Sequence, residues 1–142
     1  MRVEFRSNIT RQMLKDEPDI LFVFGDNLRR YGLGGQAKEM RGAANAVGIP
    51  TKVAPNMEKD AFFTDNHYHE WASSCGYDLV RLLTHKGKIV WPQGGIGTGR
   101  ARLAQSSPKI HDAIECILDI LINWPQGGIG TGRARLVQSK KG

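Results

Sequence analysis

The stretch from Lys88 to Leu103, KIVWPQGGIGTGRARL, constrains the fold most, because it predicts a strand, a glycine-rich loop and the approach to a helix. Ile89 and Val90 are the β-branched pair that a buried strand favours, and Pro92 ends the strand because proline donates no ladder hydrogen bond. Closely spaced glycines let several backbone N–H groups point at one anion, so this loop predicts a phosphate site, with a mobile surface loop as the alternative. The glycines are Gly94, Gly95, Gly97 and Gly99.

The most strand-like run of the chain is Ile20–Phe24, ILFVF, which is apolar without interruption. A run of this kind is typical of a parallel strand that is covered on both faces. A second glycine-rich loop follows it, GDNLRRYGLGGQ (Gly25–Gln36). The carboxyl ends of parallel strands meet at one edge of a sheet. We therefore expect the two loops to lie side by side and to hold a diphosphate between them.

The other segments alternate between helix and strand. Gly48 is expected to end one helix, and Ser107 with Pro108 to begin the last one. This alternation predicts an α/β fold with three layers, α/β/α, and a mainly parallel sheet, formed by a single domain over residues 1–123. The expected elements are an edge strand at 2–5, helices at 7–15, 36–47, 64–84 and from 108 onward, and strands at 49–53 and 88–91.

The composition is that of one globular domain, since 40% of the 142 residues are apolar and 24% are charged. No apolar run is long enough to span a membrane, and the first ten residues lack the apolar segment of a secretory signal. Cys75 and Cys116 lie far apart without a CxxC spacing, which favours two reduced thiols in helix cores. We therefore expect a cytoplasmic protein without a membrane partner.

The net charge of +6 comes mostly from the last nineteen residues, which hold four basic residues and no acidic one. Subtracting those four leaves +2 for residues 1–123. This suits a small anionic ligand, while nucleic-acid binding through the basic tail is the weaker alternative.

Residues 124–142 form a tail in which Trp124–Leu136 repeats Trp91–Leu103 letter for letter. The first copy follows a strand and the second follows a helix that ends near Asn123, so the repeat is not the unit of a solenoid. We interpret the tail as a duplication or a cloning scar that is inert and weakly ordered. The alternative hypothesis is that it imitates the first loop, covers the site or docks on a neighbour.

Asp26 and Asn27 stand at the end of the apolar strand, where the polar functional groups of parallel sheets gather. Asp26 is a candidate to accept hydrogen bonds from ribose hydroxyls or to activate a water, and Asn27 to donate to a ribose or carbonyl oxygen. The alternative role of both residues is turn formation. Arg29, Arg30 and Arg100 are candidate phosphate ligands, with solvated surface charge as the alternative.

Aromatic residues are candidate walls for a nucleobase. Phe63 is favoured because it lies in a loop, Tyr31 and Phe62 are further candidates, and Trp91 is expected in the core. The segment His67-x-His69-Glu70 invites a metal interpretation, but residues two apart on a helix point in different directions and no third ligand has a useful spacing. We therefore expect neither a metal nor a cofactor.

Two segments resemble the macro domain family, which binds ADP-ribose. DILFVFGDNLRRYGLGGQAKEM (Asp19–Met40) resembles its strand, asparagine loop and glycine-rich helix start. IVWPQGGIGTGRARLAQSSPKIHDAI (Ile89–Ile114) resembles its later strand, its diphosphate loop and the following helix. The whole also resembles small macro-like proteins of phages and bacteria. The resemblance implies a macro-domain-like fold and an ADP-ribose-type ligand, and in some members hydrolysis of ADP-ribose esters or of ADP-ribose 1″-phosphate.

The resemblance further implies a distal ribose near Asn27, Gly34 and Gly35, and a diphosphate on the loop that contains Gly95 to Gly99. The asparagine pair of the family is represented by Asn27 alone, with Asp26 beside it, and no acidic residue for adenine recognition is identifiable. The candidate catalytic residues are thus Asp26 and Asn27. The candidate ligand-binding residues are Gly25, Gly34, Gly35, Gln36, Gly94, Gly95, Ile96, Gly97, Thr98, Gly99 and Arg100.

Two other hypotheses accompany this one. GGIGT (Gly94–Thr98) resembles the PGGxGTxxE loop of the cytokinin-activating, lysine-decarboxylase-like nucleotide phosphoribohydrolases. The catalytic glutamate of that loop corresponds to Ala101 here, which leaves binding of a nucleotide monophosphate without the chemistry. The other hypothesis is a phage-type protein-interaction module on the same fold. A deep pocket between Asp26 and Thr98 would favour a small ligand, and a flat surface would favour a protein partner.

Overall fold

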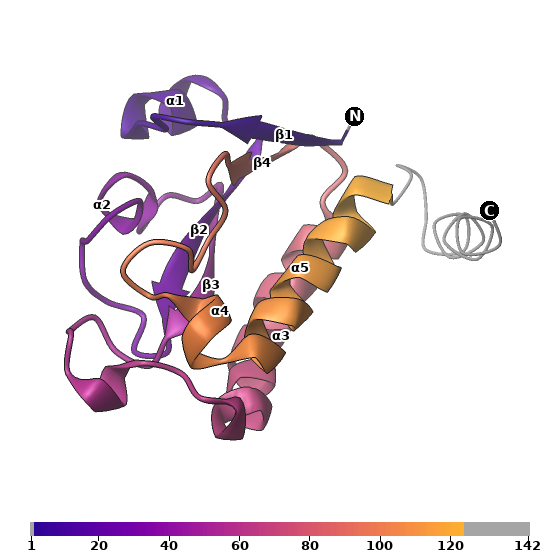
Figure 1. The fold of residues 1–142 in the computed structure, drawn as a ribbon. Helices are drawn as coiled ribbons and strands as arrows, with labels where there is room; N and C mark the ends of the chain where they lie inside the picture. The colour runs from indigo at the N-terminus through magenta and orange to yellow at the C-terminus, as the bar shows by residue number, and fades with distance from the viewer. Residues whose placement is uncertain (1, 124–142) are drawn as a thin grey trace, which may run out of the picture.

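Four parallel strands form one sheet, and helices cover both of its faces (Figure 1). The structure, a computed structural model, describes residues 2–123, so the tail with its repeat lies outside the described residues. The strands stand in the order β1-β4-β2-β3, with the expected edge strand β1 paired to β4. The predicted parallel α/β fold is confirmed. The strands are β1 (Val3–Arg6), β2 (Leu21–Asn27), β3 (Ala46–Lys52) and β4 (Ile89–Pro92).

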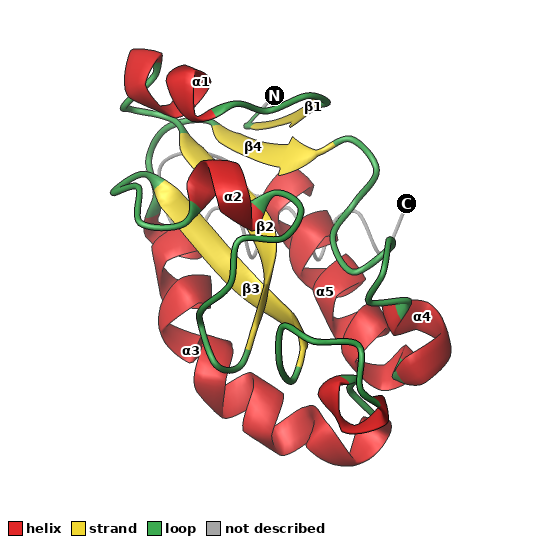
Figure 2. Ribbon diagram, turned by 90° about the vertical axis from the view of Figure 1, so that its left-hand side faces the viewer, coloured by secondary structure: helices red, strands yellow, loops and turns green. Residues whose placement is uncertain are grey.

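The helices are unequal on the two sides of the sheet. The long helices α3 (Tyr68–Thr84) and α5 (Pro108–Asn123) cover one face, and the short helices α1 (Arg11–Asp16) and α2 (Ala37–Met40) cover the other (Figures 1 and 2). The single turn α4 (Leu103–Ser106) leads into α5. Among residues 2–123, no helix combines the length and the apolar character that crossing a membrane requires.

Alternation along the strands divides the core between the two faces. Leu21 and Val23 of β2 belong to the cluster under α3 and α5, whereas Phe22 and Phe24 belong to the cluster under α1 and α2. Trp91 is buried in the larger cluster, as expected. Phe63 is also fully buried there, so its assignment as the wall of a ligand site is wrong: the loop that carries it folds back onto the core.

The helix predicted for residues 36–47 is wrong. Only the four residues of α2 are helical, and turns lead from there into β3 at Ala46. Arg41 leaves the helical conformation at ψ 131°, and its guanidinium reaches back to the carbonyl oxygen of Gly32 at 2.8 Å. This tertiary contact outweighs the helical spacing of Ala37, Met40, Ala44 and Val47.

Gly48 lies in the middle of β3, opposite Phe24, rather than at a helix end. A Cβ atom at this position would stand 2.6 Å from Oδ2 of Asp26 and 2.9 Å from the ring of Phe24. The strand therefore needs glycine because the buried side chains of β2 lean over its backbone.

We predict that Gly48→Ala lowers the free energy of unfolding by about 1–3 kcal/mol, because the added methyl overpacks a buried position. Gly94→Ala is the matched control, since a Cβ there meets no atom within 4 Å. Urea unfolding of both variants measures the difference. Equal stability of the two variants would contradict this account of Gly48.

The two cysteines differ in their surroundings. Cys75 on α3 is buried, which confirms the expected core thiol, and burial raises its pKa to about 11. Cys116 on α5 is exposed, so the expectation of a second core thiol is wrong. It lies on the face of α5 that points away from Ile110, Ile114 and Leu121.

We predict that a thiol reagent at about pH 8 modifies only Cys116 in the folded protein, because the buried Cys75 stays protonated and inaccessible. Mass spectrometry of the labelled peptides measures this. The Cys116→Ser variant should then show no labelling until denaturant is added. Rapid labelling of Cys75 in the folded variant would contradict its placement in the core.

Candidate functional site

The connections of β2 and β4 diverge at the carboxyl edge of the sheet. These strands are neighbours, with Leu21 opposite Ile89. The chain leaves β2 toward α2 on one face, and leaves β4 toward α4 and α5 on the other (Figure 2). A parallel sheet has a ligand crevice where neighbouring connections part in this way. A pocket of about 630 Å³ lies at this point of the structure.

The two glycine-rich loops line this pocket together, as expected from the position of each loop after a parallel strand. The loop after β3 closes a third side with Thr51, Lys52 and Met57, among others. The candidate site residues that are absent from the lining are Gly94 and the two arginines Arg29 and Arg30. The predicted residues that do line the pocket are Gly25, Asp26, Asn27, Gly34, Gly35, Gln36, Gly95, Ile96, Gly97, Thr98, Gly99 and Arg100.

The loop after β4 presents free backbone donors. Gly95 and Gly97 adopt φ angles of +85° and +74°, which favour glycine. The turn is closed by Thr98, whose hydroxyl donates to the carbonyl oxygen of Gly94 at 2.9 Å, and by the amide of Leu103, which donates to Gly97 at 2.9 Å. Within residues 2–123, the amides of residues 96 to 100 donate to no protein acceptor. They are available to an anion.

The glycines of the pocket fall into two kinds. A Cβ at Gly32 would stand 2.9 Å from Pro55, and one at Gly97 would stand 3.1 Å from Leu103, so the fold itself requires both glycines. A Cβ at Gly34 or Gly99 would meet no atom within 4 Å, and neither residue has a positive φ. Close approach of a ligand to the backbone gives a physical reason for glycine at Gly34 and Gly99.

Asp26 belongs to the pocket lining, and its side chain is only 3% exposed. The guanidinium of Arg41 binds both carboxylate oxygens, at 2.5 Å and 3.2 Å. Arg30 stands 3.6 Å from Oδ2, and a shift in the pairing of β2 with β3 occurs directly after Asp26. Such a bulge redirects the side chains beside it. Asn27, the residue after the bulge, lines the pocket together with Asp26.

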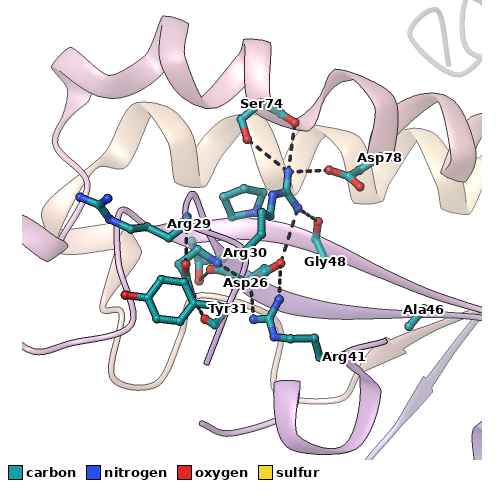
Figure 3. Close-up of polar contacts among 12 residues, drawn as sticks. Asp26, Arg29, Arg30, Tyr31, Arg41, Ala46, Gly48, Ser74 and Asp78 are labelled. Carbon is teal, nitrogen blue, oxygen red and sulfur yellow. Dashed lines mark hydrogen bonds and ion pairs between the residues drawn. The ribbon is translucent and has the colours of Figure 1, made fainter. Parts of the chain in front are cut away.

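Arg30 is engaged by the protein itself. It donates to the carbonyl oxygens of Gly48 at 2.8 Å and Ser74 at 3.0 Å, and forms an ion pair with Asp78 at 2.8 Å (Figure 3). Its role is to fasten the loop after β2 to α3, and neither Arg30 nor Arg29 lines the pocket. Of the candidate phosphate arginines, the structure places only Arg100 in the pocket lining.

Asn27 closes the loop that it begins. Its Oδ1 accepts from the amide of Arg29 at 3.0 Å, and its Nδ2 donates to the carbonyl oxygen of Tyr31 at 2.8 Å. These are the contacts of a turn-forming asparagine, the alternative role considered for this residue. They also fix the Asn27 side chain at the pocket wall.

The pocket carries an excess of positive charge. Asp26 and Asp78 balance Arg41 and Arg30, whereas Lys52 and Arg100 have no carboxylate partner within residues 2–123. Burial, and then the nearby charge of Arg100, lower the pKa of Lys52. The amine of Lys52 donates to the carbonyl oxygen of Asn56 at 2.5 Å. Two uncompensated cations at one pocket indicate an anionic ligand.

Sequence reasoning missed Arg41 and Lys52. Lys52 ends β3 as Asn27 ends β2, so the rule that selected Asn27 applies to Lys52 too. Arg41 offered no such signal, because it fell inside the predicted helix. The metal interpretation finds no support in residues 2–123, where no group of three metal-ligating side chains forms. His67 instead accepts from the amide of Thr64 at 2.9 Å, which caps the single 3-10 turn Asp65–His67 directly before α3.

Fold and pocket together define a parallel α/β protein with a pocket where the connections of two neighbouring strands part. The chain belongs to the family of unknown function DUF7831, which matches residues 4–117. No curated protein and no solved structure matches the chain. The resemblance to macro domains therefore stays a prediction.

We predict that Asp26→Asn lowers the free energy of unfolding by about 2–4 kcal/mol, because it leaves Arg41 partly buried without its counter-charge. Asp78→Asn is the matched control, since Arg30 keeps its bonds to Gly48 and Ser74. Urea unfolding of both variants compares the two losses. A loss for Asp78→Asn as large as that for Asp26→Asn would show that Asp26 is not the centre of the network.

Proposed function

We propose that the pocket binds ADP-ribose or a related nucleotide diphosphate, with the diphosphate against residues 95 to 100. One observation carries this proposal: backbone amides without an acceptor in residues 2–123 and two uncompensated cations, Lys52 and Arg100, belong to one pocket at the carboxyl edge of a parallel sheet. Amide donors and cations together are the usual surroundings of a protein-bound phosphate. The volume of about 630 Å³ lies within the range of small-molecule sites.

The opposite wall suits a sugar. Gln36 lines the pocket, and its Oε1 is buried without a hydrogen-bond partner within residues 2–123. A buried acceptor without a donor costs free energy, and a ribose hydroxyl would supply that donor once the Gln36 side chain turns into the pocket. Gly34 and Gly35 beside it leave room for the ring. This supports a distal ribose between Asn27 and Gln36.

The contacts of Asp26 favour binding over hydrolysis. A general base needs an accessible carboxylate oxygen, and both oxygens of Asp26 accept hydrogen bonds from Arg41. We therefore assign Asp26 the role of holding Arg41 at the pocket wall. The phosphoribohydrolase hypothesis finds a buried Ala101 where its glutamate would stand. The hollow between Asp26 and Thr98 favours a small ligand over a protein partner.

Calorimetric titration with ADP-ribose, NAD and AMP tests the proposal. We expect one diphosphate ligand to bind at least about tenfold more tightly than AMP, because only a diphosphate reaches both the loop amides and the two cations. Gly99→Val should weaken that binding at least about tenfold without changing the free energy of unfolding, because its side chain would occupy the path of the phosphates.

Gly94→Val is the control, because Gly94 belongs to the same loop but not to the pocket lining. Its affinity should equal that of the unmodified protein. Absence of binding by all three ligands at millimolar concentration, or an equal loss in both variants, would overturn the proposal.

A further inference from the structure

A second pocket of about 530 Å³ adjoins the first, and Met57 lines both of them. We call it the Phe62 pocket, after the aromatic ring in its wall. It lies between the loop after β3 and the helical turn α4, so the elements that enclose it are those that flank the phosphate loop. It is lined by Met57, Lys59, Phe62, Arg102, Gln105 and Ser106.

Lys52 lies between the two pockets. It belongs to the lining of the first, and its amine stands 4.8 Å from the ring centroid of Phe62 in the second. The guanidinium of Arg102 lies 5.7 Å from the same centroid. Cations near an aromatic face are attracted by its electron density, and both side chains lie against the ring. A ligand whose phosphates contact Lys52 would extend directly toward Phe62.

The lining of the Phe62 pocket has a polar group that the protein leaves without a partner. The hydroxyl oxygen of Ser106 is buried, and within residues 2–123 it makes no hydrogen bond. The lining contains Met57 and the ring of Phe62 as apolar surface, the amide of Gln105, and no carboxylate. An aromatic face next to hydroxyl and amide groups suits a planar heterocycle with nitrogen and oxygen atoms on its edge.

Arg102 covers this pocket from a special backbone conformation. Its φ and ψ angles of 44° and 47° are left-handed, which is unfavourable for a residue with a side chain. It directly precedes α4, so the same turn that ends the phosphate loop carries the guanidinium toward Phe62.

We infer that the Phe62 pocket binds the nucleobase of the ligand whose diphosphate occupies the first pocket. This inference rests on the proposed function, and it makes the ligand a true nucleotide rather than a sugar phosphate or a free diphosphate. The exposed side chain of Arg102 moves off the ring so that the base stacks between it and Phe62, and the Ser106 side chain turns to form a hydrogen bond with the edge of the base. Phe62 and Ser106 are then the residues that determine specificity for a base.

Two probes, ADP-ribose and inorganic diphosphate, separate the base from the phosphates. Phe62→Leu should weaken ADP-ribose about tenfold and leave the affinity for diphosphate unchanged, because stacking on the ring is lost. Tyr77→Leu, at an aromatic residue 75% exposed on α3, is the matched control and should change neither affinity.

Ser106→Ala provides a second test that does not depend on the packing of Phe62. Removing a buried hydroxyl without a partner should leave the stability equal or higher, whereas the affinity for ADP-ribose should fall about fivefold and that for diphosphate should not. If both probes bind the unmodified protein but neither variant separates them, the Phe62 pocket does not hold the base and the proposed function stands. If neither probe binds, the proposed function fails, and this inference fails with it.

Discussion

The buried carboxylate of Asp26 is the constraint on which the rest of the pocket depends. Taking a carboxylate out of water is costly unless cations and donors compensate it, and Asp26 is compensated by Arg41 and Arg30. Each of these arginines also binds backbone elsewhere, Arg41 at Gly32 and Arg30 at Gly48 and Ser74. One buried charge thus ties β2 to the loop below it, to β3 and to α3, and fixes the floor of the pocket.

The strands could be predicted from the sequence because their signals are local. Ile20–Phe24 is apolar throughout, and β-branched residues precede Pro92, so β2 and β4 are found by inspection. Local signals did not show that the helix predicted for residues 36–47 ends after Met40. Its apolar spacing is real, but Gly42 adopts a φ of +87° and Arg41 turns toward Asp26, which lies fifteen residues earlier. Only the folded arrangement shows that this ion pair replaces the helix.

The site was predicted to the extent that it follows from strand ends. Parallel strands deliver their carboxyl ends to one edge, so two glycine loops far apart in sequence had to meet there. No comparable sequence pattern predicts whether a single charged residue will line the pocket or bind another part of the protein. Arg30 and Arg41 are both arginines close to a glycine loop, yet the first is bound to α3 and the second lines the pocket. Burial by neighbouring elements decides between these roles, and a sequence does not display it.

The pocket separates the charges that stabilise the fold from those that are free for a ligand. Asp26, Asp78, Arg30 and Arg41 form a neutral network, and its contacts leave little of their charge for an incoming anion. Lys52 and Arg100 stand outside it, and burial together with the nearby charge of Arg100 lowers the pKa of Lys52. The proposed anionic ligand would lie beside both cations without breaking any ion pair of this network. Under the proposed function, binding energy would therefore come from Lys52 and Arg100 while the network of Asp26 stays intact.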